Sequence, residues 1–203
     1  MNDERNTELT PMRKSATLHF EDYRTQFPPR PADLSKSSER ILHSDKPYET
    51  QDLCSDPEVS ALQEAPQNAA HYTTADPEVA DNSDTKWLTQ DKSNLYLWLV
   101  RSDDVKICPE NGVLGQSTQR ERLSHTNLSG PAPAHCGGEL WFRDAGSLYL
   151  NGGSSRFTAR NRAEWEAIEA AFRVSGYKVC SFGWNEEIGK PKRTLRKGEI
   201  EWL

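Results

Sequence analysis

The stretch 122–157 concentrates the side chains of this chain that could carry chemistry. It contains His125, then Glu139 directly after a Gly-Gly pair, then a second Gly-Gly pair followed by Ser154-Ser155-Arg156. Apolar runs separate these polar groups, which is the pattern of rigid strands that present reactive loops. The stretch therefore predicts a polar site built at the ends of strands.

The histidine and the acid are the candidates for proton transfer. His125 precedes the hydrogen-bonding residues Thr126 and Asn127 in a Gly- and Pro-rich loop, which suits a general base or a donor that orients a ligand. Glu139 heads an apolar run, where it either points into a cleft or serves as an edge charge that blocks aggregation. A loop histidine that only caps a turn is the alternative for His125.

Metal binding is not expected, because the spacing of the ligand-type side chains in this stretch matches no standard zinc pattern. Those side chains are His125, His135, Cys136 and Glu139.

Anion binding is the chemistry suggested by the second Gly-Gly pair, in the run 151–157. Glycines let backbone amides approach a phosphate or carboxylate closely, and Ser154, Ser155 and Arg156 add donors. The Gly-Lys-Ser/Thr element of a P-loop is missing, and a plain turn is the alternative. The basic run Lys190–Lys197 adds phosphate-compatible charge or forms a solvated tail.

Composition divides the 203 residues into two regions. Residues 1–85 carry 17 acidic and 8 basic side chains, a net charge of −9, and contain no glycine and no tryptophan. They lack the apolar density that offsets the entropy of ordering, so we expect a disordered or extended acidic tail. Residues 86–203 carry 14 acidic and 17 basic side chains, net +3, with the aromatics and turns of a compact domain.

The sequence leaves alternatives open for one segment of the tail and for the oxidation state of the cysteines. The segment Ala16–Phe27 has a partial helical stripe, and either docks on the domain or a partner, or stays solvated. No two of the four cysteines lie close together in the sequence, so free buried thiols are expected, with two disulfides as the alternative.

The domain is predicted to be α+β, with a mostly antiparallel sheet and one main helix. Asn161–Gly176 is the helix, with Asn161 as N-cap and an apolar face formed by Trp165, Ile168 and Phe172. The region 112–129 is expected to be a loop, and Asp144-Ala145-Gly146 a hairpin connection. The predicted strands are Asn94–Arg101, Val105–Cys108, Gly138–Arg143, Ser147–Asn151, Tyr177–Trp184 and Gly198–Leu203.

The motif order His125-Thr-Asn-Leu, Gly137-Gly-Glu-Leu and Ser154-Ser-Arg-Phe resembles a series found in small bacterial domains. Those domains read His-Ser/Thr-x-Leu, Gly-Gly/Ala-Gly-Glu and Ser-Gly-His/Arg-Tyr, and occur in polymorphic toxins and effector-like proteins. The resemblance covers roughly residues 95–185 and implies a toxin or effector. This chain has Ser155 where Gly is usual and Phe157 where Tyr is usual, so a role that needs a phenol at 157 does not carry over.

A second resemblance is to ADP-ribosyltransferases, which order an arginine, a Ser-Thr-Ser-like strand start and a late glutamate. Arg101, Ser154-Ser155 and Glu186-Glu187 follow that order here. The Glu-x-Glu spacing of the family is absent, because the two acids are adjacent. This resemblance implies NAD as the cofactor or substrate.

Two functions of different classes follow. The first is a bacterial toxin or effector enzyme, an NAD-using transferase or glycohydrolase. Glu139 or Glu187 would stabilise an oxocarbenium-like centre and His125 would orient the ligand. The residues expected to bind the nucleotide are Arg101, Asn127, Ser154, Ser155 and Arg156.

The second function is a non-enzymatic interaction module whose acidic tail binds a protein partner or serves as a secretion segment. Nucleic acid is not expected as a partner, because the domain is only mildly basic. No apolar run approaches the length of about 20 residues that spans a bilayer, so no membrane partner is expected. The chain is expected to be cytoplasmic, or a secreted effector without a cleavable signal peptide.

Overall fold

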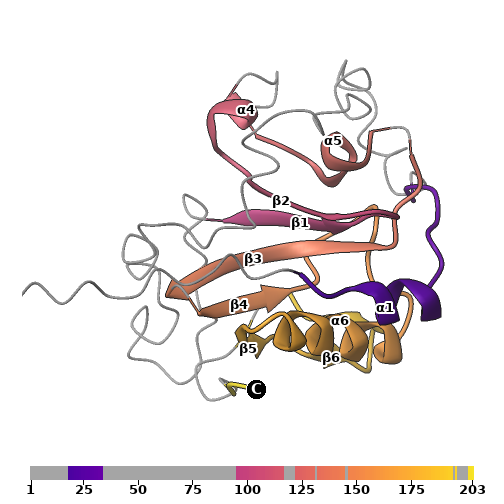
Figure 1. The fold of residues 1–203 in the computed structure, drawn as a ribbon, viewed down its shortest axis with the longest axis vertical. Coiled ribbons are helices and arrows are strands. Elements are labelled where there is room, and N and C mark those ends of the chain that lie inside the picture. The colour runs from indigo at the N-terminus through magenta and orange to yellow at the C-terminus, as the bar shows by residue number, and fades with distance from the viewer. Residues whose placement is uncertain are drawn as a thin grey trace, which may run out of the picture.

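The computed structural model describes residues 18–33, 95–116, 122–130, 132–144, 146–193, 195 and 201–203. Its centre is a five-stranded sheet in the order β2-β1-β3-β4-β5 (Figure 1). The strands are β1 (Tyr96–Val100), β2 (Val105–Pro109), β3 (Cys136–Asp144), β4 (Ser147–Asn151) and β5 (Lys178–Ser181). A two-stranded sheet of β6 (Trp184–Asn185) and β7 (Lys190–Pro191) follows.

The pairing within the five-stranded sheet is antiparallel except between β4 and β5, which are parallel. The connection between these two strands is the main helix, α6 (Arg162–Val174), because parallel neighbours need a crossover. The predicted α+β class, with a mostly antiparallel sheet and one main helix, is confirmed. Every residue of β1 is buried, as expected for an apolar strand between two neighbours.

Local sequence signals set the boundaries of α6. The side chain of Asn161 accepts a hydrogen bond from the backbone N–H of Glu164 at 2.9 Å, which is the predicted N-cap. Gly176 follows the helix with φ +92°, a left-handed conformation that favours glycine. Trp165, Ile168 and Phe172 are all buried.

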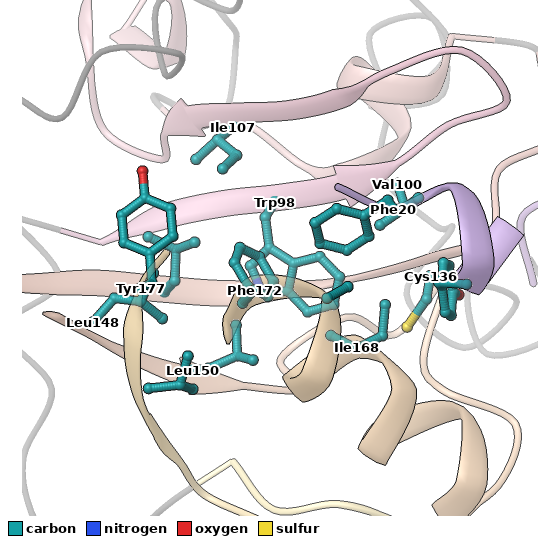
Figure 2. Close-up of a cluster of buried hydrophobic side chains, with 14 of the residues drawn as sticks. Phe20, Trp98, Val100, Ile107, Cys136, Leu148, Leu150, Ile168, Phe172 and Tyr177 are labelled. Carbon is teal, nitrogen blue, oxygen red and sulfur yellow. The ribbon is translucent and has the colours of Figure 1, made fainter. Parts of the chain in front are cut away.

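One face of the sheet packs on α6 through a continuous apolar cluster (Figure 2). Trp98 lies at its centre, with ring contacts to Trp165 at 6.5 Å and to Phe172 at 5.6 Å between centroids. Alternate residues of the paired strands, such as Leu140 and Leu150, point to this same face.

The opposite face carries two separate apolar clusters. Leu97 and Leu99 of β1 pack with Leu123, Leu128 and Phe157, among others. The second cluster contains Leu95, Trp141, Tyr149, Cys180, Phe182 and Leu195. Two short helices, α4 (Val113–Gln116) and α5 (His125–Ser129), lie in the region predicted to be a loop, so that prediction is wrong at these residues.

The N-terminal region contributes a segment to the folded domain. Its helix α1 (Glu21–Gln26) lies beside α6, and Phe20 and Tyr23 are buried (Figure 1). Composition placed residues 18–33 in the acidic tail, whereas the structure packs them on the domain, as the docking alternative for Ala16–Phe27 proposed. Residues 1–17 and 34–85, on which the rest of the tail prediction falls, lie outside the described residues.

The chain after β7 is described only in part. Of the predicted strand Gly198–Leu203, residues 201–203 are described and are not assigned as a strand. Leu203 nevertheless exchanges two backbone hydrogen bonds with Val179 of β5, at 2.8 and 3.2 Å. Cys108, Cys136 and Cys180 are free and buried, as predicted, and Cys54 is outside the described residues.

Candidate functional site

A polar pair, Glu139 of β3 and Asn151 of β4, separates the two apolar clusters on the second sheet face. The two residues are direct partners in the antiparallel register, and Glu139 also pairs with Leu97 of β1. Paired residues of antiparallel strands point to the same face, so all three side chains lie on the face opposite α6.

Asn151 is fully buried, and its side-chain amide connects three parts of this region by hydrogen bonds. Its Nδ2 donates to Glu139 Oε2 at 3.0 Å and to the backbone oxygen of Arg193 at 3.4 Å. Its Oδ1 accepts from the backbone N–H of Gly153 at 2.8 Å. One amide therefore positions a carboxylate, a turn and the segment that follows β7.

The glycines of the two Gly-Gly pairs allow backbone to approach these polar side chains. A Cβ at Gly153 would lie 2.2 Å from Glu139 Oε2, and a Cβ at Gly137 would lie 2.8 Å from Cδ2 of His125. The half-buried carboxylate of Glu139 is therefore confined between the Gly153 backbone and the Asn151 amide. A carboxylate that is already held in place needs little reorganisation energy to stabilise a positive charge that develops beside it.

His125 lies at the start of α5, whose N-terminus is closed by a capping box of Ser124 and Asn127. Its Nε2 is 2.8 Å from the backbone oxygen of Gly138, the residue before Glu139. Since a carbonyl only accepts, Nε2 carries the proton and donates. Within the part of the chain that the structure describes, no group donates a hydrogen bond to Nδ1.

Burial lowers the pKa of His125 to about 4, although the hydrogen bond to Gly138 opposes the shift. The positive charge of Arg193 lowers this pKa further. His125 is therefore neutral at neutral pH, and its ring fixes the backbone that carries Glu139.

The start of the basic run borders the same site. β7 contains Lys190 and Pro191, and a Cβ at Gly152 would lie 2.2 Å from the Cβ of Pro191. Arg193 has an exposed side chain, and its backbone oxygen is held by Asn151. The segment 191–193 thus lies against the site, and the charge of Arg193 is close enough to act on His125.

Two further predicted binding residues shape the loops around the site. Asn127 Oδ1 accepts from the backbone N–H and the hydroxyl of Ser124, both at 2.9 Å. Ser154 is buried, and its Oγ accepts from the backbone N–H of Phe157 at 3.0 Å. These contacts hold the α5 terminus and the 152–157 turn in shape.

Two further predicted site residues, Arg101 and Glu187, are engaged by other contacts or lie in an exposed turn. Arg101 binds both carboxylate oxygens of Asp104 at 2.7 Å, and its Nη1 donates to the backbone oxygen of Leu128 in α5 at 3.4 Å. Glu187 is exposed in the turn between β6 and β7. The neighbouring Glu186 pairs with Arg162 at 2.7 Å, which ties this turn to the first turn of α6.

Arg156 and Ser155 lie at the outer side of the 152–157 turn. Ser155 is exposed, and the backbone oxygen of Arg156 accepts from the N–H of Asp33 at 2.9 Å. The structure therefore brings together His125, Glu139 and the turn that contains Ser154. Asn127 shares α5 with His125, Arg101 contacts the same helix at Leu128, and Glu187 lies in the exposed β6–β7 turn.

Sequence reasoning did not assign a role to Asn151 or Arg193 individually. The signal for Asn151 was its place at the end of a predicted strand, directly before a Gly-Gly pair. Only the register shows that it faces Glu139.

Comparisons with protein-family models, with curated proteins and with solved structures gave no match to this chain. Among the described residues, no group of three or more His, Cys, Asp or Glu side chains is placed to hold a metal ion. No helix in the described ranges has the length and apolar character needed to cross a membrane.

Proposed function

We propose that the domain is an enzyme that uses NAD, as an ADP-ribosyltransferase or a glycohydrolase of the toxin or effector class. Glu139 is the carboxylate that stabilises the oxocarbenium-like centre formed when the nicotinamide–ribose bond breaks. The supporting observation is the confinement of this carboxylate by the Asn151 amide and the Gly153 backbone, on a face that is otherwise apolar.

The neighbouring residues take supporting roles in this proposal. Arg193, whose charge acts on His125, suits a phosphate of a dinucleotide, since cationic donors bind phosphate strongly. His125 is neutral and acts through Gly138, so it positions the strand that carries Glu139.

Two carboxylates compete for the catalytic role, and matched variants separate them. The full chain is assayed for nicotinamide release from NAD, with Glu139→Gln and Glu187→Gln measured in parallel. Loss of a group that acts directly on the reacting centre lowers kcat by about 10²-fold or more. We expect that loss for Glu139→Gln and a change of less than about twofold for Glu187→Gln, whose side chain is exposed in a turn.

Each other outcome is informative. A loss confined to Glu187→Gln would move the site to the β6–β7 turn. No release of nicotinamide by a folded full chain would reject the NAD enzyme.

The second candidate is a non-enzymatic interaction module in which the N-terminal region takes part in binding. The observation that favours it is the docking of residues 18–33 on the domain, which shows a surface able to hold a peptide. A full chain that neither binds nor consumes NAD, but retains a protein partner through its N-terminal region, would support this candidate.

A further inference from the structure

The surface between α6 and the start of β3 is covered by residues 18–33. Phe20 is fully buried there, and its ring meets that of Phe172 edge to face at 5.2 Å. Figure 2 shows Phe20 close to Val100 and Phe172. An aromatic residue from the N-terminal region thus completes the apolar cluster on this face.

Tyr23 makes the specific polar contact of the segment. Its hydroxyl donates to Oε1 of Glu164 at 2.9 Å, and Glu164 is fully buried. Arg160 binds the same carboxylate, with Nη2 at 2.7 Å from Oε1. A buried charge is costly unless it is paired and hydrogen-bonded, so Tyr23 and Arg160 satisfy this acid together.

The part after α1 adds to the domain in the manner of a short strand. Arg30 exchanges two backbone hydrogen bonds with Ala134, at 2.8 and 2.9 Å. His135 donates from Nδ1 to the backbone oxygen of Phe27. Arg160 Nη1 donates to the backbone oxygen of Pro28 at 3.1 Å.

These contacts resemble two known modes of peptide recognition: a helix laid on an apolar surface, and an extended segment that pairs its backbone, here through the isolated bridge between Arg30 and Ala134. A helix of six residues is too short to persist alone, so α1 gains its order by docking. Residues 34–95 separate the segment from β1, and every contact described above is non-covalent.

We propose that this surface is a peptide-docking site, and that residues 18–33 are its detachable intramolecular ligand. The recognised pattern is Phe-x-x-Tyr-x-x-x-Phe-Pro-Pro-Arg: two buried aromatic anchors at Phe20 and Tyr23, then an extended segment that pairs its backbone at Arg30. In this chain those letters are Phe20, Tyr23 and Phe27-Pro28-Pro29-Arg30. The inference does not depend on the NAD activity.

The test starts from the full chain with a site-specific protease sequence inserted between residues 34 and 94. After cleavage, size-exclusion chromatography shows whether the N-terminal fragment stays with the domain, and near-UV circular dichroism reports the fold. A fluorescent synthetic peptide of residues 18–33 is then added to the cleaved protein, and its binding is followed by anisotropy.

We expect the fragment to remain bound and to exchange with the peptide. A peptide with Phe20→Ala and Tyr23→Ala should bind at least about 100-fold more weakly, because buried aromatic anchors dominate such interfaces. Thr25→Ala is the matched control, since Thr25 is exposed and bonds only within its own helix to Glu21, and it should bind within about threefold of the parent.

Two results would overturn the proposal. A fragment that leaves a still-folded domain, with no peptide binding, would show that the contact needs the covalent connection. A domain that unfolds on cleavage would show that the segment is an integral part of the core.

Discussion

The two faces of the five-stranded sheet bury their side chains in different ways. The α6 face is one continuous cluster, running from Phe20 through Trp98 to Tyr177 (Figure 2). The opposite face has two apolar clusters with the pair Glu139 and Asn151 between them. Both faces come from the same strands, and alternate residues of β1 serve one face and then the other.

The difference shows how stability and a candidate site share one sheet. An apolar cluster stabilises the fold in proportion to the area that it buries, with little dependence on direction. Buried polar groups instead require hydrogen-bond partners with defined geometry, and the loss of any one partner lowers the free energy of unfolding. Variants on the two faces should therefore differ in both the size and the kind of effect.

The largest expected effect is on the α6 face. Phe172→Ala removes a fully buried ring that contacts both Phe20 and Trp98, and should lower the free energy of unfolding by about 3–5 kcal/mol. Urea unfolding of the full chain measures it. Val174→Ala is the control, because Val174 is 70% exposed on the same helix and should change stability by less than about 0.5 kcal/mol.

The next effect belongs to His125 and depends on pH. Its pKa is about 4 in the folded protein against 6.5 ordinarily, so the unfolded chain binds a proton first as pH falls. Neutral His125 therefore contributes about 3 kcal/mol to the free energy of unfolding. This contribution is fully present above about pH 6.5 and is lost as the pH falls to about 4.

The variant His125→Gln tests this effect, because glutamine can still donate to Gly138 but does not titrate. Its free energy of unfolding should fall less steeply than the parent's between pH 6.5 and 4. The pKa of His135 is also lowered, chiefly by burial, so part of the slope should remain. If the free energy of unfolding falls with the same slope against pH in parent and variant, His125 is not buried in its neutral form.

The smallest of the three effects is on the polar pair. Asn151→Leu keeps the approximate volume but removes the hydrogen bonds to Glu139, Gly153 and Arg193, and should cost about 1–3 kcal/mol. Thermal unfolding measures it. Asn185→Ala is the control, since Asn185 makes a comparable turn contact to Glu187 N–H in a part-exposed hairpin where water can replace it.

Activity adds a second criterion for the same pair. If the proposed role of Glu139 is right, Asn151→Leu should lose NAD turnover while it remains folded, and Asn185→Ala should retain it. Equal losses of stability in the two variants would contradict the expectation that the buried Asn151 amide contributes more to stability than the part-exposed Asn185 amide.

Local patterns were enough to predict most regular elements. The N-cap of Asn161, the apolar face of α6 and the glycine after it identify the helix without any tertiary information. The hairpin between β3 and β4 follows from two apolar runs around Asp144-Ala145-Gly146. By contrast, α5 was expected to be a loop, because His-Thr-Asn-Leu-Ser is too short and polar to show a helical period.

Within the candidate site, the sequence predicted which residue types could take part, but not which of them contact one another. The sequence marks His125, Glu139 and the 151–157 turn as chemically interesting, since each combines a reactive group with glycine or proline neighbours. It gives no means of deciding that Arg101 is bound by Asp104 or that Glu187 lies in an exposed turn. Those outcomes depend on which strands become neighbours.

The sequence alone thus determined the α+β class, the main helix and the hairpin, because each depends on periodicity or turn chemistry within a short window. Tertiary structure alone decided that Asn151 faces Glu139 and that His125 reaches Gly138. It also decided that Phe20 and Tyr23 join the core across more than 70 residues of sequence. The physical reason is that strand register and long-range docking are set by the packing of the whole domain, which no local pattern encodes.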